Sequence, residues 1–325
     1  VRWLGGIIIL AIFTFSILQL ETQQSTLAAQ SESHNSYLPL ILKNSMVDEY
    51  IIIGWSDLGM HCYDQDYSVF SILPSYHTLW SQVILRGDPP QLITQDISVE
   101  FSFPDNTESA SKTNFWDYGD QRFGVDLPLN TGLTGVGMAG EMELASSGAY
   151  FVAEGIPLTE FSDSAPTTPD PYQLASLVVK AEGTSIELAE TTIVAPVSSE
   201  MRCDTCHDEE DPNNYRRDIL LIHDDENKTH LTAQADGGDP VLCAECHADP
   251  ALGLPGDSRY PSLSEAIHTS HYGEAQDCYD CHPGEQTQCL RDVMSQPPTS
   301  YGCTDCHGSM QDVGDKNRDP WVDEP

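Results

Sequence analysis

The stretch Pro240-Val-Leu-Cys-Ala-Glu-Cys-His247 contains the pattern that decides how the second half of the chain folds. Two cysteines stand three positions apart, and a histidine follows the second one at once. The same C-x-x-C-H pattern occurs four times after residue 200, at Cys203/Cys206/His207, Cys243/Cys246/His247, Cys278/Cys281/His282 and Cys303/Cys306/His307. These motifs use eight of the ten cysteines.

C-x-x-C-H is the attachment signature of c-type haem. Two cysteines at this spacing reach the two vinyl groups on one edge of the porphyrin and form thioethers, which holds the next histidine under the iron as the proximal ligand. Paired C-x-x-C units also build zinc sites, and secreted domains use cysteines for disulfides. Neither alternative requires a histidine after every second cysteine. The sequence therefore predicts four covalently attached haem c groups, with His207, His247, His282 and His307 as proximal ligands.

The segment after residue 200 has four further histidines outside the motifs, which equals the number of distal positions that four haems require. They are His223, His230, His268 and His271. Three of them end short helical segments, which we expect at Tyr215–His223 and Leu263–His271. His230 follows the acidic stretch 224–228, which is typical of a solvated turn. Met294 and Met310 are the alternative distal ligands, and a methionine would raise the potential of its haem.

The first half of the chain has the pattern of β-structure. Ile97, Val99, Phe101 and Phe103 alternate with polar residues, as in a half-buried strand. Short apolar runs separated by turn residues recur at 50–55, 83–85, 150–153 and 177–179. Gly183 lies between two such runs and favours a hairpin. We predict a mixed protein: an all-β, sandwich-like domain over 49–197, followed by a loop-rich, short-helix multihaem cytochrome c domain over 198–325.

The N-terminus has the pattern of an export signal. Arg2 precedes a mostly apolar run from Trp3 to Leu20, and small residues follow at 26–29. We interpret 1–29 as a signal peptide, with an N-terminal anchor as the alternative, and 30–48 as a tether. Either interpretation puts the rest of the chain outside the cytoplasm, which means an extracellular, cell-surface or periplasmic location.

The chain has 51 acidic and 14 basic side chains, for a formal net charge of −37. So negative a surface repels nucleic acid and favours cationic partners, although a well-solvated surface is the alternative explanation. Two cysteines lie outside the motifs. In an oxidising compartment we expect Cys62 and Cys289 to form a disulfide, with free thiols or intermolecular pairing as the alternatives.

The sequence also resembles a family of secreted prokaryotic multihaem cytochromes that exchange electrons beyond the cell membrane. The matching stretches are Asp57-Leu-Gly-Met-His-Cys62, Ser68-Val-Phe-Ser-Ile-Leu-Pro74, Pro240–His247, Cys278-Tyr-Asp-Cys-His-Pro-Gly284, Gln288-Cys-Leu-Arg291 and Pro320-Trp-Val-Asp-Glu-Pro325.

The resemblance implies a β domain followed by a haem domain, with the four motif histidines as proximal ligands. It also implies distal roles for His223, His268 and His271, whereas the position of His230 is less regular in such proteins. Relatives commonly continue past residue 325 into another haem motif, so a chain truncated at its C-terminus is one interpretation.

We therefore expect an electron-transfer protein, not an enzyme, whose irons are mostly ligated by two histidines. Redox proteins or extracellular acceptors are its expected partners, and a homo-oligomer or filament is one form it could take. His61 and His77 lie in the predicted β domain. A surface position or local hydrogen bonding is the simpler role for them, and the alternative is that His61 ligates a haem of its own or a neighbouring subunit. A multihaem reductase of a small nitrogen or sulfur oxyanion is the alternative function, but it needs an open iron and a cationic funnel.

Overall fold

The computed structural model describes residues 49–199, 201–207, 214–274, 278–282, 304 and 307–315. These residues all belong to one unit. The predicted signal peptide and tether at 1–48 lie outside the described residues, as do Cys289, Cys303, Cys306 and Met294. Among the described residues, no helix has the length and the apolar character that crossing a membrane requires.

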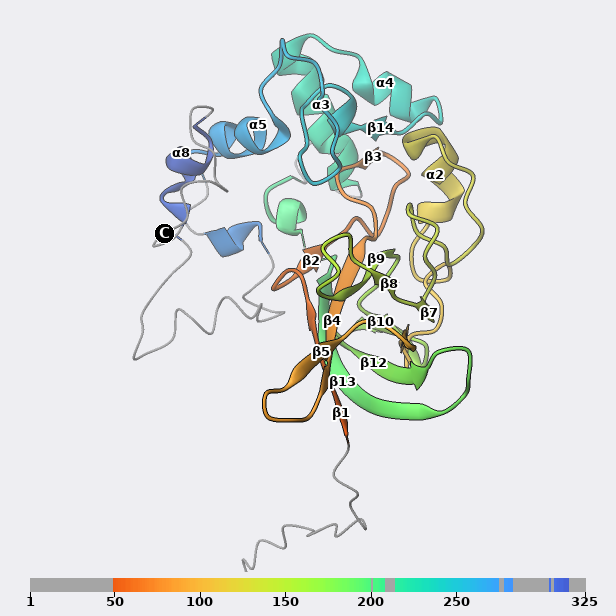
Figure 1. Cartoon of the computed structure of the whole chain (residues 1–325). Coiled ribbons are helices and arrows are strands. Elements are labelled where there is room, and N and C mark those ends of the chain that lie inside the picture. Colours follow the sequence, from red (N-terminus) through yellow and green to blue (C-terminus); the bar gives the residue numbers. More distant parts are fainter. Residues whose placement is uncertain are drawn as a thin grey trace, which may run out of the picture. The chain divides into compact units, whose positions relative to one another are not determined.

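The structure is mixed and strand-rich, with a few short helices (Figure 1). The strands of the first half form two five-stranded sheets. One sheet has the order β1-β4-β9-β8, with β5 paired to β4, and the other has the order β2-β13-β12-β6-β7. The bounds of these strands are β1 Tyr50–Ser56, β2 His61–Cys62, β4 His77–Leu85, β5 Gln91–Ile93, β6 Ile97–Ser102, β7 Ala139–Glu141, β8 Glu143–Leu144, β9 Phe151–Ile156, β12 Tyr172–Ala181 and β13 Glu187–Ser198.

The alternating pattern at 97–103 gives β6 its strictly alternating burial, with Ile97, Val99 and Phe101 inside. The predicted hairpin is confirmed, because β12 and β13 pair antiparallel and Gly183 between them has φ +67°. Only glycine adopts such a backbone conformation without strain. Two small sheets complete the strands: β10 (Phe161–Ser162) with β11 (Ala165–Pro169), and β3 (Phe70–Ser71) with β14 (Val241–Leu242).

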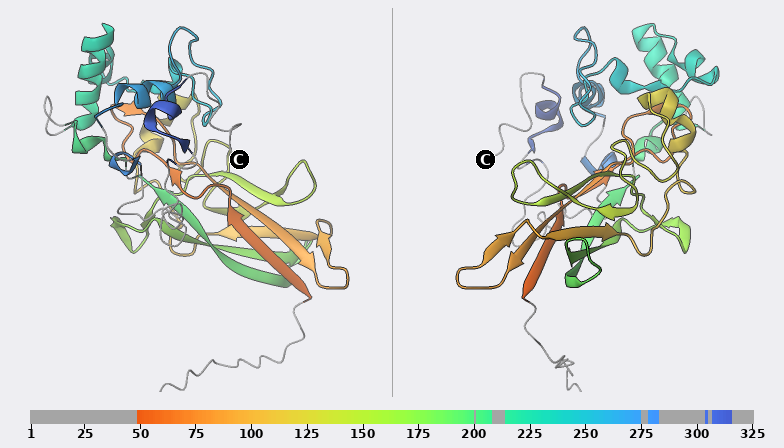
Figure 2. Two further views of the ribbon diagram at one scale, coloured as in Figure 1. Left: turned by 90° about the vertical axis from the view of Figure 1, so that its left-hand side faces the viewer. Right: turned by 45° about the vertical axis from the view of Figure 1, so that its right-hand side comes forward.

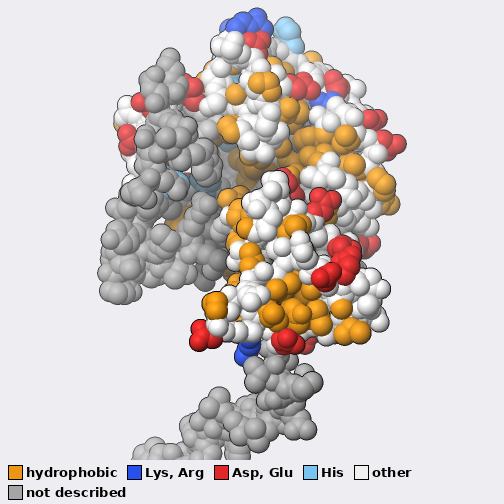
Figure 3. All heavy atoms as spheres, viewed as in Figure 1, with side chains coloured by type: hydrophobic (Ala, Val, Ile, Leu, Met, Phe, Trp, Pro, Cys, Tyr) orange, Lys and Arg blue, Asp and Glu red, His pale blue; other side chains and the backbone are white. Residues whose placement is uncertain are grey.

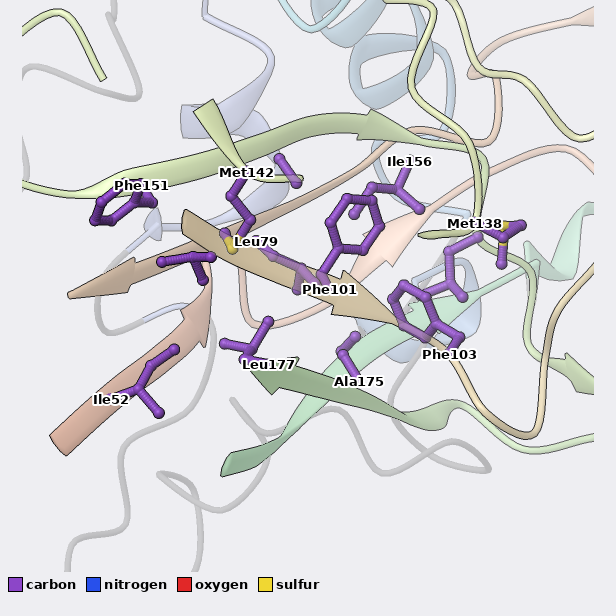
Figure 4. Close-up of a cluster of buried hydrophobic side chains, with 14 of the residues drawn as sticks. Ile52, Leu79, Phe101, Phe103, Met138, Met142, Phe151, Ile156, Ala175 and Leu177 are labelled. Atoms are coloured by element: carbon purple, nitrogen blue, oxygen red, sulfur yellow. The ribbon is translucent and has the colours of Figure 1, made fainter. Parts of the chain in front are cut away.

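Side chains from both five-stranded sheets form one apolar cluster (Figure 4). Leu79 and Val83 of β4 belong to it, together with Leu177 and Val179 of β12, and all four are fully buried. The two sheets approach closely at Gly54 of β1, where an added Cβ would lie 2.3 Å from Leu177 Cδ1. Figure 2 shows the strands of both sheets from two further sides.

One helix corrects the all-β prediction for 49–197. Helix α2 (Phe115–Phe123) buries Phe115, Gly119 and Arg122 and ends at Gly124, which has φ +68°. The buried face of this nine-residue helix holds one large apolar side chain, a glycine and an arginine, so it produces no apolar repeat at helical spacing. The hydrophobic pattern therefore did not predict this helix.

The second half contains short helices, the two predicted ones among them. Helix α3 (Tyr215–Asn227) extends one turn beyond the predicted His223, and helix α5 (Leu263–Ser270) ends immediately before His271. The other described elements are α4 (Leu231–Asp236), α8 (Met310–Val313) and the 3₁₀ turns η1 (Arg202–Thr205), η2 (Cys243–Glu245) and η3 (Cys278–Asp280).

Candidate haem-binding site

Three of the four C-x-x-C-H motifs are described in full, and they share one backbone conformation. In each motif the first cysteine begins a single helical turn or lies within it, in η1, η2 or η3. The carbonyl of the first cysteine accepts hydrogen bonds from the N–H of the second cysteine and of the histidine. The N···O distances are 3.2 and 3.0 Å in the first motif, 3.2 and 3.0 Å in the second, and 3.3 and 2.9 Å in the third. The residues of each described motif therefore form one turn through their own backbone hydrogen bonds, and this turn fixes the histidine relative to both cysteines.

Each of these three motif histidines faces one of the predicted distal histidines. The ring centres are 5.9 Å apart for His207 and His271, 6.4 Å apart for His223 and His247, and 6.0 Å apart for His268 and His282. The three pairs differ in the angle between ring planes, which is 79°, 88° and 16° respectively. The number of histidines in the sequence predicted four pairs. The structure brings three pairs together and shows which distal candidate lies next to which motif histidine.

The two histidines of α5 belong to different pairs. His268 lies within the helix and faces the third motif, whereas His271 caps its C-terminus and faces the first. These two motifs are also in contact through the backbone, because Arg202 N–H donates to the Cys281 carbonyl at 3.4 Å. The first and third motifs therefore lie side by side, although the second motif separates them in the sequence.

Three of these histidines have the same kind of hydrogen-bond partner at Nδ1. Nδ1 of His247, His268 and His271 lies 2.9, 2.7 and 2.7 Å from the main-chain carbonyls of Pro261, Ser264 and Ile267. A carbonyl only accepts, so the hydrogen-bond network assigns the proton to Nδ1 and leaves the lone pair on Nε2. This is the tautomer of a metal-ligating histidine, whose second nitrogen usually donates to a carbonyl or carboxylate.

Two further histidines have oxygen partners at Nδ1. His223 Nδ1 is 2.9 Å from Thr229 Oγ1, and His207 Nδ1 is 3.7 Å from the buried carboxylate of Asp218. Burial lowers the pKa of both histidines, and the facing histidine lowers it further in each pair. Both imidazoles are therefore favoured in the neutral form, which is the form that ligates metals.

The motif cysteines differ in exposure. Cys206 and Cys246 are exposed, whereas the first cysteine of each described motif is half-buried. Burial raises the pKa of the Cys203 thiol to about 11 and that of the Cys243 thiol to about 12.

The backbone just after the second motif packs closely against Gly256. An added Cβ at Gly256 would lie 2.3 Å from the Ala248 nitrogen, so this position has no room for a side chain.

Two short parallel strand pairs attach the first two motifs to the first half of the chain. Strand β2 pairs with the end of β13 at Val197–Ser198, just before the first motif. Strand β3 pairs with β14, which runs directly into Cys243. Val69 and Phe70 pack with Leu220 of α3 and Val241 in a small buried cluster. Sequence reasoning did not predict these pairs, because two-residue strands leave no hydrophobic period.

The remaining predicted residues are placed as follows. His230 is exposed at the start of α4, and no ring contact among the described residues joins it to a motif histidine. His307 and Met310 are half-buried near α8, which contacts α5 through a 3.5 Å hydrogen bond from Thr269 Oγ1 to the Gly314 carbonyl. Their ligand roles stay predictions. Cys62 lies half-buried in β2, and its predicted disulfide with Cys289 involves a residue outside the described ones.

His61 and His77 form a fourth histidine pair of a different kind. Both side chains are buried, their ring centres are only 4.3 Å apart, and His61 Nε2 lies 2.6 Å from the Asp57 carboxylate. Local bonding of His61 is thus observed, and a ligand role for it stays a prediction. The prediction of a surface or locally bonded residue is wrong for His77, because it is buried and neither of its ring nitrogens has a hydrogen-bond partner among the described residues. Burial, followed by the nearby His61, lowers its pKa well below 6.5.

The chain matches no family model, no curated protein and no solved structure.

Proposed function

We propose that this chain is a multihaem c-type cytochrome, in which a sandwich-like β domain over 49–197 precedes a domain over 198–325 that holds four haem c groups. The eight motif cysteines would form the thioethers. Each such haem supplies one-electron chemistry between ferric and ferrous iron, with a potential set by the axial ligands and their surroundings. The chain's own contribution is to hold these groups and to tune them by ligand, burial and charge.

The spacing of the three imidazole pairs carries the proposal. An imidazole–metal bond is about 2 Å long, and the ligating nitrogen lies about 1 Å from the ring centre, so two imidazoles on opposite sides of one metal have centres about 6 Å apart. The observed separations are 5.9, 6.0 and 6.4 Å. The Nδ1–H tautomers of His247, His268 and His271 add to this, because they leave the Nε2 lone pair available to a metal.

From these pairs we propose a specific set of ligands. His271 would be the distal ligand opposite His207, His223 opposite His247, and His268 opposite His282. His230 remains the proposed fourth distal histidine, with Met294 and Met310 as the alternatives. An iron held by two histidines would have no coordination position open to a substrate, which favours electron transfer over catalysis. The adjacency of the first and third motifs also makes their haems direct neighbours in the proposed chain of electron carriers.

The surface charge bears on the proposed partners. Acidic side chains are scattered over the face in Figure 3, and basic ones are few. The 51 carboxylates against 14 basic residues would stabilise the oxidised, more positive haems and lower their potentials. Redox proteins with a basic docking surface, or an extracellular acceptor, are the proposed partners of an exported protein. A homo-oligomer or filament is a further proposal.

Single-histidine variants of the purified, exported protein test the assignments. We expect the wild-type protein to carry four haems by pyridine haemochrome assay and intact mass, with low-spin ferric EPR signals only. Alanine substitutions at His223, His268 and His271 should each convert one haem of the four to a form that is high-spin or binds carbon monoxide. Thr229→Ala is not a suitable control because it contacts His223, whereas exposed Tyr272→Ala beside His271 is suitable and should change nothing.

Two outcomes contradict the proposal. A colourless protein, or pigment that acidified acetone extracts, would exclude thioether-bound haem. A high-spin signal in the wild-type protein would show an open iron and would favour the multihaem reductase instead.

A further inference from the structure

The Nδ1 partner of His223 differs from those of His247, His268 and His271, and unlike the Asp218 carboxylate 3.7 Å from His207 Nδ1 it is a hydroxyl. His247, His268 and His271 have main-chain carbonyls at Nδ1, whereas His223 has the hydroxyl of Thr229 at 2.9 Å. Thr229 lies in the short turn between α3 and α4, six residues beyond His223. The carbonyls at His268 and His271 belong to residues four positions earlier in the same helix, so any sequence would supply them. The hydroxyl at His223 depends on the presence of threonine at position 229.

The direction of each hydrogen bond follows from the chemistry of the groups. Thr229 Oγ1 lies 2.6 Å from Asp224 Oδ1, and an ionised carboxylate only accepts, so the hydroxyl donates its single hydrogen to Asp224. The oxygen of Thr229 must then accept from His223 Nδ1. Asp224, Thr229 and His223 therefore form a chain of hydrogen bonds that runs from a negative charge to an imidazole.

Asp224 is itself held in place by the backbone of the next helix. Its Oδ1 accepts from Leu231 N at 2.7 Å and its Oδ2 from Thr232 N at 2.9 Å, which are main-chain donors in the first turn of α4. The residue in the capping position of α4, His230, makes no side-chain capping bond. Asp224 takes that role, so the turn that carries Thr229 is fixed at both ends.

We propose that Asp224, acting through Thr229, is a positioning residue that orients His223 and lowers the reduction potential of the haem held by His223 and His247. This inference rests on the proposed function. The imidazole N–H donates a hydrogen bond to the hydroxyl, and the hydroxyl donates one to the carboxylate. This polarisation would make a ligating imidazole a stronger electron donor and would stabilise the oxidised iron. Within the described part of the chain, His268 Nδ1 meets the Ser264 carbonyl and hydroxyl and no carboxylate.

The test is a spectroelectrochemical titration of the intact haem-loaded protein and its variants. Thr229→Val keeps the shape of the side chain but removes the hydroxyl. We expect it to shift the oxidised-to-reduced ratio of one haem out of four by about tenfold at a fixed applied potential, which is about 59 mV upward for a one-electron couple. Thr229→Ser should restore the wild-type potential, which a purely structural role of the methyl group would not do.

Two further variants complete the design. Asp224→Asn removes the charge and keeps one of the two oxygens that accept from the first turn of α4, and it should shift the same haem in the same direction. Ser264→Ala is the matched control, because it removes a hydroxyl 3.3 Å from His268 Nδ1 while leaving the carbonyl at 2.7 Å, and we expect no shift from it.

The outcomes separate this inference from the proposed function. Four low-spin haems with unchanged potentials in both Thr229→Val and Asp224→Asn would overturn the role of Asp224 and leave the cytochrome assignment intact. An equal shift in Ser264→Ala would also overturn it. A wild-type protein without covalent haem would overturn the proposed function itself.

Discussion

The two halves of the described chain differ in what fills their interiors. Strands β1 to β13 enclose a cluster of buried apolar residues contributed by both sheets. Among the described residues after 200, the buried apolar side chains are Leu220, Val241, Leu242 and Ala244, and part of this set packs against Val69 and Phe70 of the first half. The paired imidazoles of the second half are half-buried, apart from the exposed His282, and so are four of its motif thiols.

This difference indicates that the free energy of folding has a different source in each half: the apolar pattern in the first half and the C-x-x-C-H motifs in the second. In the first half, burial of apolar area supplies the free energy of folding. In the second half, we propose that binding free energy supplies it, as in other metal-dependent folds. The two halves should therefore respond differently to substitutions.

Removing one attachment motif should have the largest effect. The double substitution Cys243→Ala/Cys246→Ala should remove one haem and expose the second half to proteolysis, while strands β1 to β13 keep their protection. Intact mass and hydrogen exchange of the exported protein measure both effects. Equal loss of protection in both halves would show that they do not fold by separate routes.

A cavity in the first half should produce the converse result. Leu177→Ala removes a fully buried side chain that packs against β1, and we expect it to cost about 2–5 kcal/mol in the free energy of unfolding. The haem number should not change. Ile186→Ala on the same hairpin is the control, because Ile186 is 62% exposed and its loss should cost under about 0.5 kcal/mol.

The junction of the two halves should have a distinctive pH dependence. Burial raises the pKa of Asp64 to about 6, against the opposing effects of hydrogen bonds from Ile72 and Leu73 and of Arg216, while Asp66 adds to the rise. The unfolded chain loses this proton near pH 4 and the folded chain only near pH 6, so stability falls as pH rises between these values.

Asp64→Asn should remove that loss and raise stability at pH 7 by an amount on the order of 3 kcal/mol. Urea unfolding at pH 4 and pH 7 measures it. Asp66→Asn is the matched control with the opposite sign. Hydrogen bonds from Ser68 and Asn114 lower the pKa of Asp66 despite its partial burial, so this substitution should destabilise the protein at pH 7. The same response from both variants would contradict the assignment.

A smaller effect is expected at the buried pair of the first half. His77 is fully buried, and its ring nitrogens have no hydrogen-bond partner in the described ranges, which costs about 1–3 kcal/mol. Its lowered pKa keeps it neutral when folded, so the wild-type protein should lose stability as pH falls below about 6.5. His77→Leu should be more stable, most clearly at pH 5. A destabilised variant would indicate that His77 has an unrecognised partner.

The sequence by itself determined the elements that have a local cause. The alternation at 97–103, the glycine at 183 and the helical segments around His223 and His268 predicted strands, a hairpin and helices that the structure contains. The three fully described C-x-x-C-H motifs likewise form their turns from their own backbone hydrogen bonds. Helix α2 was missed because its buried face holds a glycine and an arginine, which produce no apolar repeat.

Only the tertiary structure decided which residues meet. The count of histidines predicted how many pairs to expect, but the partners depend on where α3 and α5 place His223, His268 and His271. The short strand pairs β2–β13 and β3–β14 bring stretches near residues 61 and 70 to the first and second motifs. Two-residue strands and single side-chain contacts are too short to produce a period in the sequence, and each of these two strand pairs joins segments more than 100 residues apart.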